Sequence, residues 1–210
     1  ARRCSASWLA MNMGILRTVF DKICGIPLLQ GRVGPKRPDR LPRILSREEV
    51  DSLRKAAEDF REAFLLGLLA DCGLKIGEAC ALRWADIRLG TDEIHVAGSG
   101  STLERSVPVP ASLLPLLREG KKRFDADAPL FAGRRSGSTL STRMAERIVR
   151  RCARRAGLPH HATSMVLRHS YAVLALETGV NIRELQIRLG HASVETTMLY
   201  QRCLPPEATV

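Results

Sequence analysis

The side chains with the clearest chemical potential lie near the C-terminal end of the chain. Arg168 and His169 are adjacent, and His191 follows Arg168 by 23 residues. Tyr200 follows His191 by 9 residues. Tyrosine supplies an oxygen nucleophile, arginine a planar fork of donors matched to phosphate oxygens, and histidine a donor for developing negative charge. This set is typical of attack on a phosphodiester without a metal ion.

Each of these residues also has an ordinary structural interpretation. Tyr200 could be a half-buried tyrosine whose hydroxyl caps a backbone group, and His191 could be stabilised by the dipole at a helix C-terminus. Arg168 could pair with Glu177 or Glu184. The spacing that links the arginine, the histidine and the tyrosine favours the chemical interpretation.

Three short helices are predicted to position these groups. Arg168 lies in a helix over residues 164–177, and the next helix is capped by Asn181 and closed by Gly190. A last helix begins after Ser193 and carries Tyr200.

The rest of the chain reads as mainly helical with one small antiparallel β-hairpin, which predicts an α+β fold. A capping box over residues 46–49 begins a run of helices, because a serine and a glutamate three positions later can satisfy each other's backbone amides. Residues 93–96 and 105–109 flank a Gly-Ser-Gly-Ser-Thr turn and predict the hairpin.

A basic helix is predicted over residues 139–156. Its arginines are spaced by three and four, so several share one face. We interpret that face as a phosphate-contacting surface, with a solvated basic face as the alternative. The predicted DNA contacts are Arg143, Arg147, Arg150, Arg151 and Arg154 on this helix, and Arg105 in the hairpin.

The net charge is +11 and favours a polyanionic partner, of which nucleic acid is the commonest kind. A solvated basic surface, or a genome that prefers arginine codons, is the alternative. The six cysteines include no C-x-x-C pair, and no zinc site or disulfide framework is predicted. The chain has no apolar run long enough to span a membrane. These features predict a cytoplasmic, nucleoid-associated protein with no membrane partner.

The order of elements from Leu41 to about Arg202 resembles the catalytic domain of the tyrosine recombinases, the integrase family. Two groups of motifs carry the resemblance. Residues 73–78 (GLKIGE) and 82–87 (LRWADI) are similar to the family's first arginine motif. Residues 167–170 (LRHS), 189–191 (LGH) and 196–200 (TTMLY) are similar to its second.

The resemblance implies a mechanism and a role for each matching residue. In this family a tyrosine forms a 3′-phosphotyrosine, and a hydroxyl of a partner strand then reseals the DNA. Tyr200 would be the nucleophile, Arg168 the second arginine, His191 a donor and His169 a supporting residue. Glu78 would be the structural acid. No metal or small-molecule cofactor is implied, and family members self-associate as tetramers on DNA.

The resemblance also divides the chain into three parts. Residues 1–24 form one amphipathic helix that looks like the remnant of the N-terminal DNA-clamping domain of integron integrases. Residues 25–42 are a basic linker rich in Pro and Gly, and residues 43–210 are the catalytic domain.

Three positions depart from the family pattern. Lys75 stands where the first arginine is expected and lacks its bidentate fork. Met165 replaces the first histidine of the second motif, and a thioether cannot donate a proton. The hairpin has no lysine, since none occurs from Ile76 to Gly120. A lost transition-state donor typically costs about 2.7–4 kcal/mol, and a lost general acid slows a reaction by about 10²–10⁴.

Other interpretations therefore stay open. His160 or His161 could substitute for the missing histidine or could be plain loop residues. The chain could be a recombinase remnant that only binds DNA, or a helix-turn-helix regulator, although the regulator explains neither the Arg-His-Tyr spacing nor the hairpin. Relaxation of DNA without strand exchange is also compatible with this chemistry.

Overall fold

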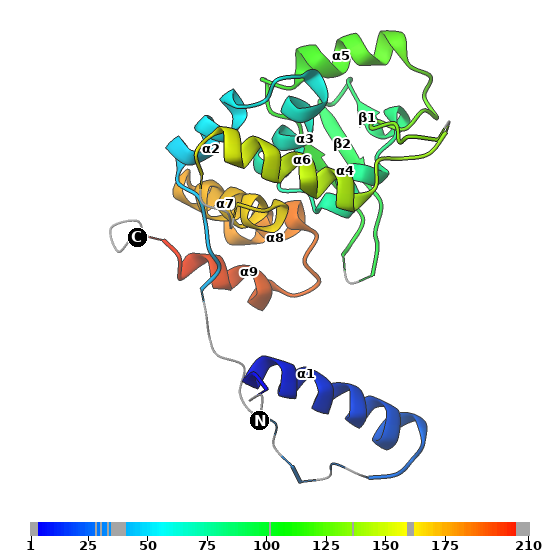
Figure 1. Cartoon of the computed structure of the whole chain (residues 1–210), viewed down its shortest axis with the longest axis vertical. Helices are drawn as coiled ribbons and strands as arrows, with labels where there is room; N and C mark the ends of the chain where they lie inside the picture. Colours follow the sequence, from blue (N-terminus) through cyan, green and yellow to red (C-terminus); the bar gives the residue numbers. More distant parts are fainter. Residues whose placement is uncertain are drawn as a thin grey trace. The chain divides into compact units, whose positions relative to one another are not determined.

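The computed structural model describes residues 4–27, 29, 31–32, 34, 41–100, 102–135, 137–158 and 162–204 (Figure 1). The chain divides into two compact units, Ala1–Arg40 and Leu41–Val210. The predicted linker over residues 25–42 falls in part outside the described residues. No helix among the described residues is long and apolar enough to cross a membrane.

Among its described residues the first unit contains one helical segment, as its apolar spacing predicts. Helix α1 (Ala6–Arg17) begins at Ser5, whose hydroxyl accepts a hydrogen bond from the Trp8 amide. It runs on into a π-helical turn, η1 (Thr18–Ile23). Large apolar side chains along this segment are exposed: Trp8, Leu9, Met11, Ile15, Leu16, Val19 and Ile23.

The second unit is mainly helical, with a small antiparallel sheet, so the predicted fold class is confirmed. The predicted capping box is present: the Ser46 hydroxyl accepts from the Glu49 amide, and the Glu49 carboxylate accepts from the Ser46 amide. The helices of this unit are α2 (Arg47–Lys55), α3 (Phe60–Ala70), α4 (Ile76–Ala81), α5 (Leu114–Arg123), α6 (Thr142–Arg155), α7 (Ser164–Glu177), α8 (Ile182–Leu189) and α9 (Val194–Gln201).

The predicted hairpin is formed by β2 (Glu93–Val96) and β3 (Arg105–Pro108), with Ile94 paired to Val107. The sequence did not predict a third strand. The short β1 (Ile87–Arg88) follows the 3-10 turn η2 (Trp84–Asp86) and pairs antiparallel with β2, giving the strand order β1-β2-β3. The apolar residues of β2 and β3 alternate inward, as expected for a sheet with one face on the core.

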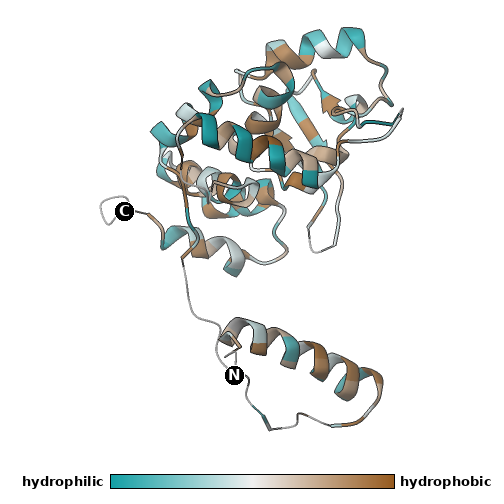
Figure 2. Ribbon diagram, viewed as in Figure 1, coloured by the Kyte–Doolittle hydropathy of each residue, from teal (hydrophilic) through white to brown (hydrophobic). Residues whose placement is uncertain are grey.

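Helix α3 forms the centre of the core. Its side chains are apolar on nearly every face, and Leu65, Leu66, Leu68 and Leu69 are fully buried, as expected for a helix surrounded by other elements (Figure 2). It packs against α2, α6 and α7. A second apolar cluster joins α7, α8 and α9 through Tyr171, Leu185, Leu189 and Tyr200. Because these three helices share one cluster, their polar side chains are held in fixed relative positions.

Candidate active site

A tight turn between α8 and α9 closes the site. Gly190 has φ of +68°, the left-handed conformation that suits glycine at a helix C-terminus. A Cβ at this position would lie 2.7 Å from Thr102 Cγ2 and 2.8 Å from Arg105 Nη1. The Leu103 amide donates to the Gly190 carbonyl at 3.1 Å. Glycine therefore allows the hairpin loop to dock on the turn that carries His191.

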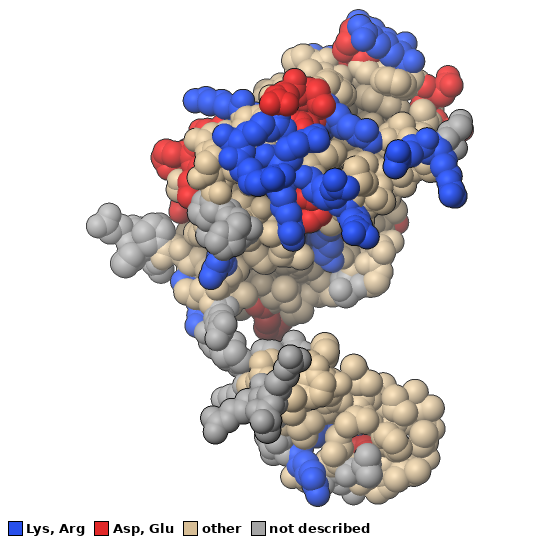
Figure 3. Space-filling view, viewed as in Figure 1, with Lys and Arg blue, Asp and Glu red and all other residues tan. Residues whose placement is uncertain are grey.

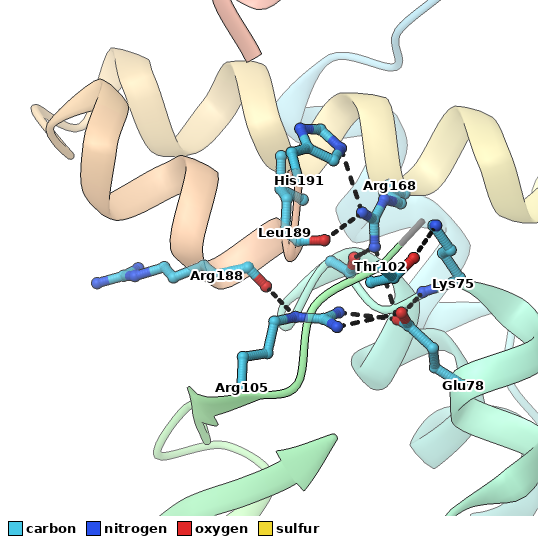
Figure 4. Close-up of polar contacts among 9 residues, drawn as sticks. Lys75, Glu78, Thr102, Arg105, Arg168, Arg188, Leu189 and His191 are labelled. Carbon is cyan, nitrogen blue, oxygen red and sulfur yellow. Dashed lines mark hydrogen bonds and ion pairs between the residues drawn. The ribbon is translucent and has the colours of Figure 1, made fainter. Parts of the chain in front are cut away.

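Arg168 is buried beneath this turn, with 2% of its surface exposed (Figure 4). Its Nη1 donates to the Gly73 carbonyl at 2.7 Å, and its Nη2 to the Leu189 carbonyl at 2.6 Å. Burial, and to a lesser degree the charge of Arg105, lowers the pKa of Arg168 against the opposing effect of Glu78. An arginine stays charged despite such a shift.

The acid beside Arg168 is Glu78, at 3.7 Å, and not Glu177 or Glu184, which the structural alternative considered. One Glu78 oxygen also accepts from the backbone amide of Lys75. Burial acts to raise the pKa of the Glu78 carboxyl, but hydrogen bonds from Arg105 and Lys75 outweigh it, and the pKa is lowered. Glu78 therefore remains an anion that holds several cationic groups of the site together.

Arg105 does not lie where the sequence suggested. We expected it at a DNA-contacting surface, but it is buried, with 6% of its surface exposed. Its two terminal nitrogens donate to the Glu78 carboxylate at 3.1 and 2.8 Å, and its Nε donates to the Arg188 carbonyl at 2.7 Å (Figure 4). The prediction is corrected: the hairpin loop docks on the Gly190 turn and carries Arg105 inward, where the Glu78 carboxylate offsets part of the cost of burying its charge.

Lys75 precedes α4 and points toward the same group of residues. Its ammonium donates to the hydroxyl of Thr102 in the hairpin loop (Figure 4). Burial, followed by the charge of Arg168, lowers the pKa of Lys75, while Glu78 acts to raise it. The sequence does not predict a role for Thr102, because only the docking of the hairpin loop brings its hydroxyl to Lys75.

The two motif histidines contact different partners. His191 Nδ1 is 2.9 Å from Thr197 Oγ1, and its Nε2 is 3.4 Å from Arg168 Nη2. Burial and the nearby charges of Arg168 and Lys75 lower the pKa of His191 to about 4. His169 Nδ1 lies 2.9 Å from the Tyr200 hydroxyl.

Tyr200 itself is 4% exposed, and burial raises its pKa although Arg168 acts in the opposite direction. Its ring stacks on that of His191, with centroids 6.4 Å apart and an interplanar angle of 18°. The structure thus brings the predicted residues Tyr200, Arg168, His191, His169 and Lys75 into one contiguous group.

A cavity of about 740 Å³ lies beside this group and opens between α4, the hairpin loop and the first turns of α6 and α7. Lys75, Glu78, Thr102 and Arg168 contribute polar atoms to its wall. Met165 also lines it and is 51% exposed, so the replaced histidine position does face this space. His160 and His161 lie outside the described residues.

The basic face predicted on α6 is solvent-exposed at all five positions, Arg143, Arg147, Arg150, Arg151 and Arg154 (Figure 3). Two of them already have acidic partners. Arg151 donates to buried Glu62 at 2.5 Å while 54% of its side chain stays exposed, and Arg150 lies 3.6 Å from Glu146.

Glu62 is a second buried acid, on α3, that fastens α6 to the core. Burial raises the pKa of its carboxyl, but hydrogen bonds from the Glu58 amide and from Arg151 and Arg155 outweigh it and bring the pKa to about 2. One side of α6 is therefore anchored while the other side presents its charge to solvent.

Comparisons with known proteins point to one family. The model of the phage integrase family matches residues 43–205. Tyrosine recombinase XerC of Xylella fastidiosa is 36% identical over 176 residues, which cover 81% of this chain and 59% of that protein. The chain thus spans about three fifths of the length of this curated relative.

Solved structures agree with the fold. The crystal structure of XerA recombinase has a TM-score of 0.69 and 29% identity, covering 99% of this chain and 74% of that one. The XerH recombinase bound to a palindromic difH substrate has a TM-score of 0.75 and 22% identity, covering 94% of this chain and 63% of that one.

Proposed function

We propose that this chain, which belongs to the phage integrase family of tyrosine recombinases, cleaves and rejoins duplex DNA through a covalent bond to Tyr200. The observation that carries the proposal is the contiguous group formed by Tyr200, His191, Arg168 and Lys75, of which Arg168 and Lys75 line the cavity. A buried tyrosine with a structural role alone would not require an arginine, a histidine and a lysine close to it. A phosphodiester under attack needs a nucleophile and a set of cationic donors.

In the proposed reaction the Tyr200 oxygen attacks the scissile phosphorus and the bond to the 5′-oxygen breaks. Arg168 and His191 stabilise the negative charge that gathers on the non-bridging oxygens. Arg168 is already oriented by the Gly73 and Leu189 carbonyls, so little reorganisation is required of it. A 5′-hydroxyl from a second strand reverses the step and releases Tyr200.

The leaving 5′-oxygen requires a proton, and we assign its donation to Lys75. The hairpin itself contains no lysine, and an arginine side chain does not give up a proton in proteins. Lys75 lies on the cavity wall, and burial lowers its pKa, which makes its ammonium a better acid. The same charge partly substitutes for the missing first arginine.

The exposed arginines of α6 are proposed to contact the DNA backbone. Arg143, Arg147 and Arg154 are exposed on the same helix whose first residue, Thr142, lines the cavity. Figure 3 shows basic side chains gathered over this helix. Residues 1–24 and 25–42 are proposed to belong to a clamp and its linker, and the protein is proposed to self-associate on nucleoid DNA.

The test is a nicked DNA substrate on which cleavage releases a short fragment, so that a covalent intermediate accumulates. Since no target sequence is known, a library of duplex sites is screened first, and covalent complexes are detected after denaturation. Wild-type protein should form the adduct and Tyr200→Phe should not.

The remaining alternative is a protein that only binds DNA. It predicts salt-sensitive binding that Tyr200→Phe leaves unchanged, with no adduct from wild-type protein on any site. In that case the combined Lys75→Arg, Met165→His and Ser99→Lys variant decides whether the three departures are responsible, because it should then recover cleavage.

A further inference from the structure

We infer that His169 is the general base that removes the proton from the Tyr200 hydroxyl as it attacks. The inference rests on the proposed strand cleavage and adds a role for a residue that the family resemblance treats as supporting. His169 Nδ1 and the Tyr200 oxygen are 2.9 Å apart, within the range over which a proton is transferred directly. The two rings lie 5.6 Å apart between centroids, at an angle of 48°.

The packing of the site holds this pair together. His169 lies on α7 next to Arg168, and Tyr200 lies on α9, which packs against α7. Tyr200 is anchored in the apolar cluster formed by α7, α8 and α9. The hydroxyl is therefore presented to His169 by two helices, so the contact does not depend on a surface loop.

The other polar groups of the site are poorly suited to accept the proton of the Tyr200 hydroxyl. His191 already directs Nδ1 to Thr197, and its Nε2 faces the Arg168 guanidinium. Arg168 and Lys75 are cations. Cys203, which follows α9, directs its thiol to the Leu199 carbonyl. Met165 stands at the position of the missing motif histidine, and its thioether is too weak a base.

The protonation states before reaction match this role. Burial, followed by the charge of Arg168, lowers the pKa of His169, so its imidazole is neutral at pH 7 and Nδ1 can accept a hydrogen bond. Burial raises the pKa of Tyr200, so the hydroxyl keeps its proton until attack begins. When a phosphate binds beside Arg168, its negative charge offsets the repulsion between Arg168 and a protonated His169. The base thus becomes stronger when substrate is present.

The step balances as follows. A Tyr200 oxygen lone pair forms the bond to phosphorus, and the hydroxyl proton passes to His169 Nδ1. The phosphorus bond to the 5′-oxygen breaks, and that oxygen receives a proton from Lys75. In the resealing step each proton returns by the same route.

The rate of adduct formation on the nicked substrate tests this role. His169→Ala should slow it about 10²- to 10⁴-fold at neutral pH, the usual effect of losing a general base. Added imidazole should restore part of the rate in His169→Ala but none in Tyr200→Phe. The deficit should shrink as the pH rises toward the pKa of Tyr200, because an ionised phenol needs no base. His95→Ala, on β2 outside the site, is the matched control and should keep the wild-type rate.

His169→Gln separates proton transfer from positioning. A glutamine amide can still accept a hydrogen bond from the Tyr200 hydroxyl but cannot hold its proton. A folded His169→Gln variant that reacts at the wild-type rate would overturn the inference, as would an alanine variant that imidazole does not rescue. Failure of the proposed function looks different, because wild-type protein itself would then form no adduct.

A measurement without DNA adds a second condition. Nitrogen-15 NMR of the histidine rings should show His169 as the tautomer with a proton on Nε2 and a bare Nδ1. Its Nδ1 signal should move in Tyr200→Phe, which removes the hydrogen-bond donor. A proton found on Nδ1 at neutral pH contradicts the inference whether or not the protein cleaves DNA.

Discussion

Removing the Glu78 carboxylate should destabilise the second unit more than any comparable change at a surface acid. Glu78 receives both terminal nitrogens of Arg105, at 3.1 and 2.8 Å, and lies 3.7 Å from Arg168. The side chains of Arg105 and Glu78 are only 2% and 6% exposed, so solvent cannot replace the lost partner. In Glu78→Gln the buried guanidinium of Arg105 keeps its charge and loses its counter-ion.

Breaking a buried ion pair by removing one partner costs about 3–5 kcal/mol. For a domain of this size each kcal/mol lowers Tm by about 2–4 °C, which predicts a fall of about 6–20 °C. Replacing both partners in Glu78→Leu/Arg105→Met should cost less than the sum of the two single changes, because Arg105 then leaves no unpaired charge, although Arg168 still loses its ion pair with Glu78. Arg168 keeps its two carbonyl partners in every variant.

The assay is urea unfolding followed by tryptophan fluorescence in a Trp8→Phe background. Trp84 is then the reporter, and it is 1% exposed in the core of the second unit. Glu119→Gln is the matched control, since Glu119 pairs with Arg123 at the surface and should contribute no more than about 1 kcal/mol.

The pH dependence of the free energy of unfolding provides a second test of this role of Glu78. Because the pKa of Glu78 is lowered in the folded state, its contribution is present above the ordinary carboxyl pKa and is lost as the pH falls through the folded value. The difference in the free energy of unfolding between wild type and Glu78→Gln should therefore become smaller as the pH falls. Two results would refute this account. One is a loss of unfolding free energy in Glu78→Gln that is no larger than in Glu119→Gln. The other is a loss in the double variant that equals the sum of the losses in its two single variants.

Three further predictions concern the site and the DNA surface. Lys75→Met should slow adduct formation about 10²- to 10⁴-fold on ordinary DNA. A substrate with sulfur in place of the leaving 5′-oxygen should restore most of the rate. Equal slowing on both substrates excludes Lys75 as the acid. Arg147→Ala and Arg154→Ala should each reduce the salt dependence of DNA binding by about one phosphate contact, measured as the slope of log affinity against log salt, whereas Arg123→Ala on α5 should not. Gly190→Ala should lower the free energy of unfolding by more than about 1 kcal/mol, because it adds a clash 2.7 Å from Thr102 to an unfavourable φ of +68°. Gly179→Ala is the control, because Gly179 has φ of +88° but a Cβ added there meets no atom within 4 Å. If both variants lose the same free energy of unfolding in urea, the clash at Gly190 contributes nothing.

Much of the fold could be predicted from local signals. Helix α7 was predicted with its observed bounds, because an N-cap threonine and a glycine after the last turn mark its ends. The capping box at Ser46 was predicted from a serine with a glutamate three positions later, and the hairpin from two strand-like runs around a Gly-Ser-rich turn. Strand β1 was not predicted, since two residues carry too little periodicity to signal a strand.

The sequence by itself also determined which residue types meet in the site, because Arg168 on α7, His191 in the turn after α8 and Tyr200 on α9 follow one another at short fixed spacings. The direction of the remaining side chains depended on partners far along the chain. Arg105 turns to Glu78, 27 residues away, and Arg151 turns to Glu62, 89 residues away.

His169 likewise contacts Tyr200 across 31 residues. Only the tertiary structure decides such contacts, since a buried charge or hydroxyl takes whichever complementary group the packed helices bring within reach. Spacing along the chain predicts that a nucleophile and its cationic donors belong together. Which group touches the Tyr200 hydroxyl is decided by how α7 and α9 pack.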